Sequence, residues 1–553
     1  MKVSKLFSIC PSIFGIGFVA FLFLSACNSS KKSDENVTFF SEKDYSELFL
    51  DSNTLKSFIS SDSEYVAIQD SVRLFYQNRL WQFAWISEGK LSQAGHHFYN
   101  QLLNYKDTYH DSSLIDRKLD SLLIESEEDE EAFFRRKPSV EKLEMLLTST
   151  FFRYAQKEFT GKAKNLEQLK WFIPRKKKNL RNLLDSLLVS TDGIRLAEPN
   201  NPYYQSLKNA LKQYRNLQKT VKWPNIPFPS QSLKPGDQDS AIPAIKKTLF
   251  LYQDWQENDT SLVFSPTLDS ALQHFQKRMG LPETGLPNEA TLNEMRVSVD
   301  DRIRQIMLNL ERIRWLPDTV SGDFILVNIP EFKMHVFQSG KQIWESNAVV
   351  GKDAGRTQIF RGNMSQIILN PSWGVPPGIV RKEVLPGIKK NISYLRKHQM
   401  DVYSGNTKVD PHKINWQQYS NRIPFTIRQR KGEENPLGKF KFMFPNSYWI
   451  YLHDSNEKYL FGASKRAFSH GCIRVEKAQE LAEYLLKKNN NWSPEKIEKE
   501  FKTTREAGLN LIKKEPVFII YLTAWVNAEG TLNFRKDIYQ LDPILGKELF
   551  GEE

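Results

Sequence analysis

The sequence predicts a multidomain α+β protein in which helical domains precede a β-rich domain. Apolar residues follow helical spacing over most of the first 300 positions, and after "LNLERIRWLP" they alternate as in strands. A proline-rich stretch at 222–239 separates two helical parts. We therefore expect a helical scaffold domain over 43–228, a small three-helix domain over 229–300 and a β-rich domain over 301–553.

The first 26 residues have the layout of an export signal. Lys2 and Lys5 precede an apolar run, which closes as Leu24-Ser25-Ala26-Cys27. The small residues before Cys27 resemble a bacterial lipobox, in which the cysteine carries the lipid of the mature protein. An uncleaved membrane anchor is the alternative, since about 20 apolar residues span a bilayer. In both cases the chain would lie outside the cytoplasm, on the periplasmic face of a bacterial envelope membrane, with 27–42 as a polar linker.

The chain has three cysteines, and the predicted processing leaves one free thiol. Cys10 would leave with the signal and Cys27 would be lipidated. Cys472 would then be the remaining thiol of an exported protein, where an unpaired thiol is exposed to oxidation. Its polar neighbours favour a chemical role over a buried structural one.

The charge balance favours an anionic partner outside the cytoplasm. The formal net charge of +12 falls to +10 when the two signal lysines are removed. The sequence shows no Arg-rich arm, zinc finger or helix-turn-helix pattern, so we expect no nucleic-acid partner. Carboxylate-rich cell-wall polymer or an anionic membrane fits better, although a solvated basic surface alone would also explain the charge.

Apolar stripes define the helical domains. In the scaffold, Leu207, Ala210, Leu211 and Tyr214 share one face. In the small domain, Ile242, Ile245 and Leu249 form one stripe, and a second helix is predicted over 267–279, with Gly280 as its left-handed cap. The second stripe consists of Leu268, Ala271, Leu272, Phe275 and Met279.

The small domain resembles the three-helix peptidoglycan-binding domain. That family's second half contains Phe-Gln, a Gly-Leu pair, another Gly and Thr-Leu. This chain matches in order with Phe275, Gln276, Gly280, Leu281, Gly285, Thr291 and Leu292. Wall binding is what the resemblance implies, and a plain helical spacer is the alternative.

The β-rich domain is predicted from alternating stretches. In "FKMHVFQ", Phe332, Met334 and Val336 alternate with Lys333 and His335. Further strands are expected at "GNMSQIILNPSW", "PFTIRQR", "GKFKFMF", "YWIYLHD", "PVFIIYLTAWV" and "TLNFRKDIY", the last two flanking a turn at 528–530. A helix in "EKAQELAEYLLKK" is predicted from its stripe of Ala478, Leu481, Ala482, Leu485 and Leu486.

The segment around Cys472 suggests nucleophilic catalysis. His453 ends a predicted strand, sixteen residues separate it from His470, and Cys472 lies in a loop before the helix. A cysteine nucleophile needs a base and a group that orients the base. His453 on a rigid strand suits the base better than His470, and Asp454 could orient it through its backbone carbonyl or its side chain.

Other residues nearby are candidates for supporting roles. Amides near Gly471 and Cys472 could form an oxyanion hole. Arg474 would brace the loop or bind a substrate carboxylate. Candidates for substrate contacts are Tyr451, Trp449, Trp373 and Ser469.

His453 followed by "SHGCIR" resembles the active-site signature of the L,D-transpeptidases of YkuD type. In that family the cysteine is acylated, the upstream histidine is its base, and the next residue orients the histidine through its backbone carbonyl. These roles would fall to Cys472, His453 and Asp454. His470, Gly471 and Arg474 match the rest of the signature.

The resemblance extends to the large YcbB-like subclass. "NPSWGVPPGIVRKEVLP", "NPLGKFKFMFPNSYWIYLHD" and "RAFSHGCIRV" look like its sequences. That subclass combines a helical scaffold, a peptidoglycan-binding module and a catalytic domain with an inserted cap, which we expect at about 374–422. A surface elaboration is the alternative for this insertion. The lipobox departs from the subclass pattern.

The resemblance implies a peptidoglycan L,D-transpeptidase with no cofactor and no metal. Cys472 would take the acyl group of a tetrapeptide stem, releasing D-alanine, and pass it to the amine of another stem as a 3-to-3 crosslink. Water as acceptor would make the protein an L,D-carboxypeptidase, and another amine would attach a different group to peptidoglycan. The implied partners are peptidoglycan stem peptides and glycan, with the membrane through the lipid anchor.

Three other classes remain open from the residues. A metal site could be built from His453, His470 and Cys472, but the spacing of the last two fits zinc ligands poorly. A non-enzymatic wall-binding lipoprotein would leave the thiol site vestigial, although every signature position is filled. A thiol protease would need the same two catalytic residues, and the neighbouring wall-binding-like module disfavours it.

Overall fold

The computed structural model describes residues 46–115, 117–175, 178–189, 199, 201–257, 259–317, 322–420 and 422–551. All of these belong to one compact unit of the chain, 40–553. The predicted export signal over 1–26, its lipidation site Cys27 and the linker lie outside the described residues. Within the described part, each helix is too short or too polar to span a bilayer.

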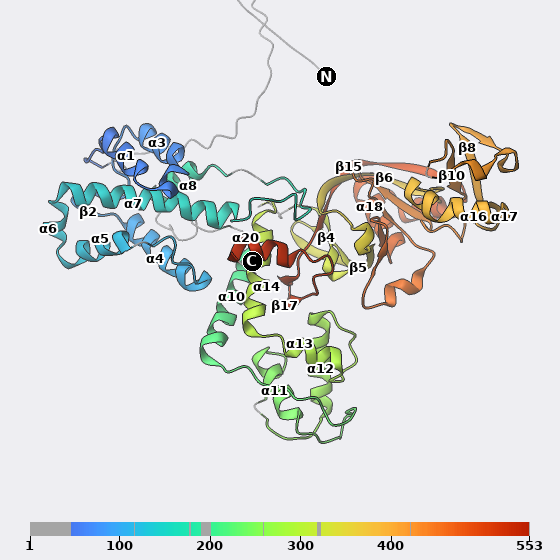
Figure 1. Cartoon of the computed structure of the whole chain (residues 1–553), viewed down its shortest axis with the longest axis horizontal. Helices are drawn as coiled ribbons and strands as arrows, with labels where there is room; N and C mark the ends of the chain where they lie inside the picture. Colours follow the sequence, from blue (N-terminus) through green and yellow to red (C-terminus); the bar gives the residue numbers. More distant parts are fainter. Residues whose placement is uncertain are drawn as a thin grey trace, which may run out of the picture. The chain divides into compact units, whose positions relative to one another are not determined.

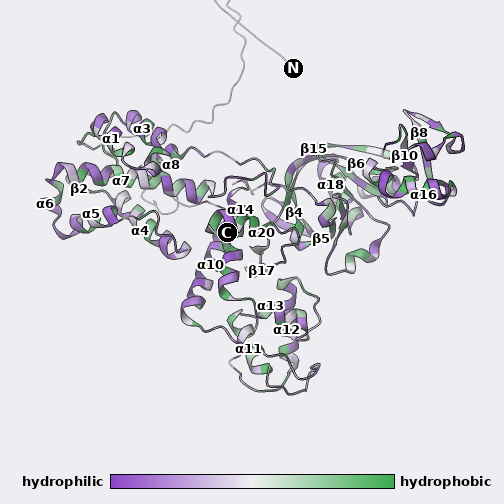
Figure 2. Ribbon diagram, in the orientation of Figure 1, coloured by the Kyte–Doolittle hydropathy of each residue, from purple (hydrophilic) through white to green (hydrophobic). Residues whose placement is uncertain are grey.

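The scaffold is a helical domain built around helix α7 (Lys137–Ala155), most of whose residues are buried. Helices α4 (Gln93–Tyr109), α5 (Arg117–Glu128) and α8 (Leu180–Val189) contact it (Figure 1). The mixed green and purple ribbons of these helices in Figure 2 reflect the apolar faces that build this core. The smaller elements are α1 (Ser52–Ser60), α2 (Ser63–Val66), α3 (Gln69–Asn78), β1 (Ile86–Ser87), β2 (Lys90–Leu91), α6 (Glu130–Phe134) and the π-helix η2 (Gln156–Thr160).

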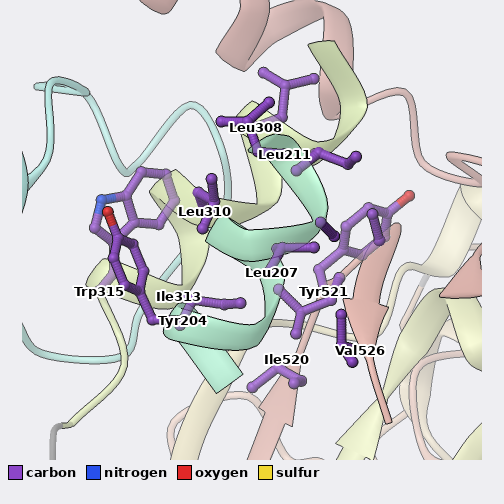
Figure 3. Packing of buried hydrophobic residues seen from close by; sticks show 14 of the residues in the cluster. Tyr204, Leu207, Leu211, Leu308, Leu310, Ile313, Trp315, Ile520, Tyr521 and Val526 are labelled. Carbon is purple, nitrogen blue, oxygen red and sulfur yellow. The ribbon is translucent and has the colours of Figure 1, made fainter. Parts of the chain in front are cut away.

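Two long helices join the domains. Helix α10 (Pro202–Thr220) packs on α14 (Val299–Arg314), and Figure 3 shows their apolar side chains meeting those at the end of the sheet of the β-rich domain. The predicted stripe of α10 is confirmed, because Leu207, Ala210, Leu211 and Tyr214 are all buried.

The small domain contains α11 (Ile242–Leu251), α12 (Pro266–Met279) and α13 (Glu289–Met295). Ser265 caps α12 by accepting a hydrogen bond from the Leu268 amide, and Gly280 ends it at φ 69°. Both predicted helices are confirmed with their stripes buried. Phe275 is wholly buried at the centre.

The β-rich domain contains a nine-stranded sheet, counted over the described residues, that closes on itself. Its order is β13-β5-β14-β12-β11-β6-β15-β3-β4, and β4 also pairs with β5. The same domain contains helices α18 (Ala478–Asn490), α19 (Pro494–Phe501) and α20 (Asp542–Phe550). The predicted apolar stripe of α18 is buried, which confirms that helix. The strands are β3 (Phe324–Asn328), β4 (Lys333–Gln338), β5 (Lys341–Gly351), β6 (Phe360–Leu369), β11 (Phe440–Met443), β12 (Leu452–His453), β13 (Ala467–Ser469), β14 (Ile473–Val475) and β15 (Ala507–Ile520).

The predicted hairpin near 528–530 forms from β16 (Ala524–Val526) and β17 (Leu532–Phe534). Two other predictions need correction. The stretch "YWIYLHD" becomes a strand only at β12, because Trp449 adopts a left-handed φ of 59°. Cys472 precedes strand β14 rather than a helix, and α18 begins after that strand.

The insertion forms a separate unit with its own sheet and core. Strands β7 (Trp373–Gly374), β10 (Thr426–Gln429), β8 (Met400–Ser404) and β9 (Thr407–Val409) pair in that order. The strand in "PFTIRQR", expected among those of the β-rich domain, therefore pairs within the insertion, because β8 and β7 flank it. The helical elements are α15 (Pro377–Ile379), η5 (Val380–Val384), α16 (Leu385–Lys390), α17 (Ser393–Lys397), and the 3-10 turns η6 (Pro411–Lys413) and η7 (Trp416–Gln418).

Candidate active site

Two short parallel strands bring the predicted base and the thiol together. β12 pairs with β14 so that His453 lies opposite Arg474, and the Ile473 amide donates to the Tyr451 carbonyl over 3.1 Å. Because side chains alternate along a strand, Tyr451 and His453 share one face, and Cys472 and Arg474 share the same face of the neighbouring strand. The chain returns to this place through β13, which pairs with β5.

Hydrogen bonds hold the loop that carries Cys472. Gly471 has a φ of 122°, its amide donates to Ser469 Oγ over 3.1 Å, and its carbonyl accepts from Thr357 Oγ1 over 2.9 Å. Ser469 Oγ in turn donates to the Cys472 carbonyl over 2.5 Å. The Gly471 amide and the buried Ser469 hydroxyl are therefore engaged within the loop. Across the described residues the Cys472 amide makes no hydrogen bond.

The buried His453 ring is held in one tautomer. Its Nδ1 lies 2.5 Å from the Asp454 carbonyl oxygen, which can only accept, so Nδ1 carries the proton and Nε2 is free to take one. Burial and the charges of Arg474 and Lys441 lower the pKa of His453 to about 3. Hydrogen bonds to the carbonyls of Asp454 and Pro436 raise this pKa, but by less. The imidazole is therefore neutral at any physiological pH.

The Asp454 carboxylate contacts two lysine residues. Its carboxylate accepts from the Lys439 amide over 2.9 Å and pairs with Lys458 over 2.5 Å. The sequence leaves open whether Asp454 contacts His453 through its carboxylate or its backbone carbonyl, and in the structure the backbone carbonyl makes this contact. The carboxylate instead holds the turn before β11 against the end of β12.

The Cys472 thiol is partly buried and protonated. Burial raises its pKa, while hydrogen bonds from the Tyr451 backbone and hydroxyl and the charge of Lys441 act in the opposite direction. Sγ donates to the Trp449 carbonyl over 3.8 Å, and no hydrogen bond to His453 occurs among the described residues. The site therefore holds a neutral thiol beside a neutral imidazole.

Three family models match this chain. Residues 322–518 match the L,D-transpeptidase catalytic domain of the YkuD family.

The chain carries a YkuD-type L,D-transpeptidase domain.

Residues 70–211 match the model of a scaffold domain, and residues 244–295 match the model described as "Putative peptidoglycan binding domain". The predicted order of a helical scaffold, a peptidoglycan-binding-like domain and a β-rich L,D-transpeptidase domain is confirmed.

Similar proteins carry related names. A Haemophilus influenzae protein named "Putative L,D-transpeptidase" is 34% identical over 241 residues, which are 43% of this chain and 48% of that protein. The chain thus spans about half the length of this curated relative. A solved L,D-transpeptidase of Stackebrandtia nassauensis is 13% identical, covering 53% of this chain and 97% of its own, with a TM-score of 0.21. One of Xylanimonas cellulosilytica is 13% identical over 53% of this chain and 100% of its own, with a TM-score of 0.17.

Lys441 is a residue of the candidate active site that the sequence-based prediction did not include. It lies opposite His453 on β11, and its Nζ lies 4.0 Å from the centre of the Tyr451 ring. Burial lowers the pKa of Lys441, while a charge on Cys472 raises it. The signal was present in "GKFKFMF", where this lysine alternates with two buried phenylalanines, but only the strand register places it beside the thiol.

The other predicted residues surround this centre. Arg474 Nη1 pairs with Glu457, which makes it a brace of the loop. Trp449 is 87% exposed beside the thiol, whereas Tyr451 lies between Lys441 and Cys472.

The insertion contributes two residues to the edge of the candidate active site. The side chain of Trp373 on β7 contacts the Tyr451 hydroxyl. Glu383 on η5 lies with Oε1 3.9 Å from Nε2 of the exposed His470. The insertion therefore borders the candidate active site at Tyr451 and His470. No group of three or more His, Cys, Asp or Glu side chains suited to a metal ion occurs within the described ranges.

Proposed function

We propose that this protein is a peptidoglycan L,D-transpeptidase in which Cys472 is the nucleophile and His453 the general base. The observation that carries the proposal is the shared strand face of the two residues, together with a tautomer of His453 that leaves Nε2 unprotonated. The match to a peptidoglycan-binding domain over 244–295 supports peptidoglycan as the substrate.

In the first step His453 Nε2 takes the proton of the thiol as Sγ attacks the carbonyl of the third stem residue. A separate thiolate-imidazolium pair is unfavourable, because the thiol pKa is raised and that of His453 is about 3. Proton transfer therefore accompanies formation of the S–C bond. The C–N bond to the terminal D-alanine then breaks, and His453 gives its proton to the leaving amine.

In the second step an amine attacks the thioester. We infer that this amine belongs to the third residue of another stem, which forms a 3-to-3 crosslink. His453 takes the amine proton and returns it to the sulfur as the S–C bond breaks. The Cys472 amide, which has no partner among the described residues, is the donor best placed for the developing oxyanion.

Intact mass spectrometry with a carbapenem tests the nucleophile. We expect one adduct on the wild-type protein and none on Cys472→Ala. A folded wild-type protein without an adduct, or an equal adduct on the variant, would sink the assignment. Incubation with disaccharide-tetrapeptide then identifies the acceptor: a dimer indicates crosslinking, and a tripeptide product would identify a carboxypeptidase instead.

The location of the protein is a separate proposal. The matches to an L,D-transpeptidase domain and a peptidoglycan-binding domain support a location outside the cytoplasm, and we propose that a lipid on Cys27 tethers the protein to the membrane. Cys27→Ala should release the protein from the membrane fraction. Retention of the variant would indicate a spanning anchor in place of the lipid.

A further inference from the structure

A second concave site lies in the L,D-transpeptidase domain, away from Cys472. It is a cavity of about 380 Å³ between strands β3 and β4, the β16–β17 hairpin and helices α10 and α12. Its described lining includes none of the residues of the candidate active site. A volume of this size is within the range of ligand sites in proteins.

The floor of the cavity is the outer face of two barrel strands. Every second residue of β3 and β4 points to it, because side chains alternate along a strand, and the residues between them point into the barrel core. The three cross-strand pairs that form the floor are Phe324 with Phe337, Leu326 with His335, and Asn328 with Lys333.

His335 is the unusual member of this floor. The alternation in "FKMHVFQ" separates it from the apolar face of its strand, yet it is only 7% exposed. Its Nε2 lies 3.0 Å from Glu331 Oε2, but its Nδ1 has no hydrogen-bond partner and the nearest carboxylate, Glu345 Oε2, is 3.6 Å away. A buried ring nitrogen without a hydrogen bond is uncommon in a folded protein and indicates a missing partner.

Two cations of the cavity, Arg535 and Lys277, form no ion pair with a carboxylate of the described residues. Glu345 pairs with Lys333 and Glu331 pairs with His335, so these charges are matched. Arg535 donates to the carbonyls of Arg278 and Phe534 over 2.8 and 2.7 Å, and lies 5.0 Å from the centre of the Trp525 ring.

Over the described ranges, no carboxylate forms an ion pair with Arg535 or with Lys277 on α12. Burial lowers the pKa of Arg535, while the charges of Glu331 and Glu294 raise it. The half-buried Arg535 guanidinium thus has carboxylates near it but none in ion-pair contact, and a bound anion would supply that contact.

We propose that this cavity is a second binding site, for a short peptide that carries a carboxylate, the chemical class of the peptidoglycan stem. The carboxylate would lie between Lys277 and Arg535, while Nδ1 of His335 and the side chains of Asn527 and Asn533 meet the polar groups of the peptide. Only the identification of the peptide as a stem rests on the proposed function. Lys277 belongs to the matched peptidoglycan-binding domain, so this site would hold a strand at the junction of the two domains.

Hydrogen–deuterium exchange locates the bound peptide in the full chain. The Cys472→Ala variant is compared with and without purified disaccharide-tetrapeptide. We expect slower exchange over 333–338 and 524–535, which border the cavity. Protection confined to 449–475, or none at all, would overturn the second site. Protection at the cavity in a protein that forms no carbapenem adduct would leave this inference standing while the proposed function fails.

A charge reversal at the rim gives an independent test. Lys277→Glu in the Cys472→Ala background should weaken the affinity for the cavity at least tenfold and abolish the protection over 333–338. Lys247→Glu, an exposed lysine of the neighbouring helix α11, is the matched control and should bind like the parent. Equal affinities of the two variants would refute the proposal. Arg535→Gln should also weaken the affinity of the cavity for the peptide. Lys277→Glu is the decisive variant, because the Lys277 side chain is exposed and its replacement leaves the fold intact.

Discussion

At the scale of single residues, burial raises the pKa of the Cys472 thiol, and Lys441 and Tyr451 offset part of that effect. Lys441 and Arg474 also oppose protonation of His453, since each places positive charge near the ring. Lys441 therefore favours a thiolate, while Lys441 and Arg474 together disfavour a stable imidazolium, which fits an imidazole that carries the proton only briefly.

Replacing Lys441 by Met removes the cation and keeps most of the side-chain length. We expect the pKa of Cys472 to rise further and iodoacetamide alkylation of the thiol near neutral pH to slow by about tenfold. The measurement is the alkylation rate against pH, followed by intact mass. Lys514→Met, at an exposed lysine of β15, should leave the profile unchanged. An unaltered profile in Lys441→Met would show that this lysine does not act on the thiol.

The pH dependence of acylation follows from His453. A base whose pKa is lowered to about 3 stays unprotonated at neutral and mildly acid pH. The His453 imidazole is therefore protonated, and unable to act as a base, only in strong acid. We expect the rate of carbapenem acylation to be flat from about pH 5 to about pH 8. Stopped-flow kinetics over this range provide the check, and an inflection near the ordinary histidine pKa of 6.5 would contradict the buried, neutral ring.

At the scale of elements, the insertion between β6 and β11 folds around its own apolar cluster. Val384, Leu385, Ile388, Val402 and Trp416 are buried in that cluster, separately from the core of the barrel. Trp373 and Glu383 of the same unit lie at the edge of the active site, next to Tyr451 and His470. We therefore expect a loss of the insertion's core to disturb the surroundings of Tyr451 and His470 without destabilising the barrel.

Trp416→Ala should loosen the insertion without unfolding the barrel. Removing a buried aromatic side chain costs about 3–5 kcal/mol, and the missing contacts here are those of the insertion. We expect faster hydrogen exchange over 375–429, unchanged exchange in β6 and β15, and slower carbapenem acylation. Uniformly faster exchange across the chain would show that the two cores are one cooperative unit. Phe425→Leu, a milder change beside Trp416, should give a smaller effect in the same direction.

At the scale of the whole molecule, a buried ion network ties the scaffold to the two joining helices. Glu158 of η2 is fully buried and pairs with Lys208 of α10 over 2.9 Å and with Arg314 of α14 over 3.2 Å. The Tyr204 hydroxyl donates to the same carboxylate over 2.9 Å. Burial alone would raise the pKa of Glu158, but the charges of Lys208 and Arg314 lower it.

Glu158→Gln should destabilise the folded chain by about 3–5 kcal/mol, because it leaves two buried cations without their shared partner. The lowered pKa also means that the wild-type network stabilises the fold above the unfolded pKa and is lost as the pH falls through the folded one. Thermal unfolding at neutral and acid pH should therefore show a difference between variant and wild type that shrinks in acid. Glu283→Gln, at an exposed glutamate, is the control, and a constant difference would assign the effect to packing alone.

Features that depend on local spacing along the chain are predicted correctly, whereas contacts between distant segments are not. The stripes of α10, α12 and α18 were predicted because local spacing decides which helix face is buried. The strand 426–429 was predicted, but not its partners, since a strand pattern does not name its neighbours. The sequence predicts an oxyanion role for the Gly471 amide, but in the folded loop this amide already donates to the Ser469 hydroxyl, a contact that the local pattern does not reveal.

The domain order, the family of the catalytic domain, and Cys472 and His453 as the pair to test all follow from the amino-acid sequence. Each depends on residue types and spacings that are local along the chain. Tertiary structure alone decided which cations face the thiol, which oxygen of Asp454 contacts His453, and how His335 becomes buried in a cavity. The reason is that strand register and domain packing join residues such as Lys441 and His453, or Lys277 and Arg535, that no local pattern connects.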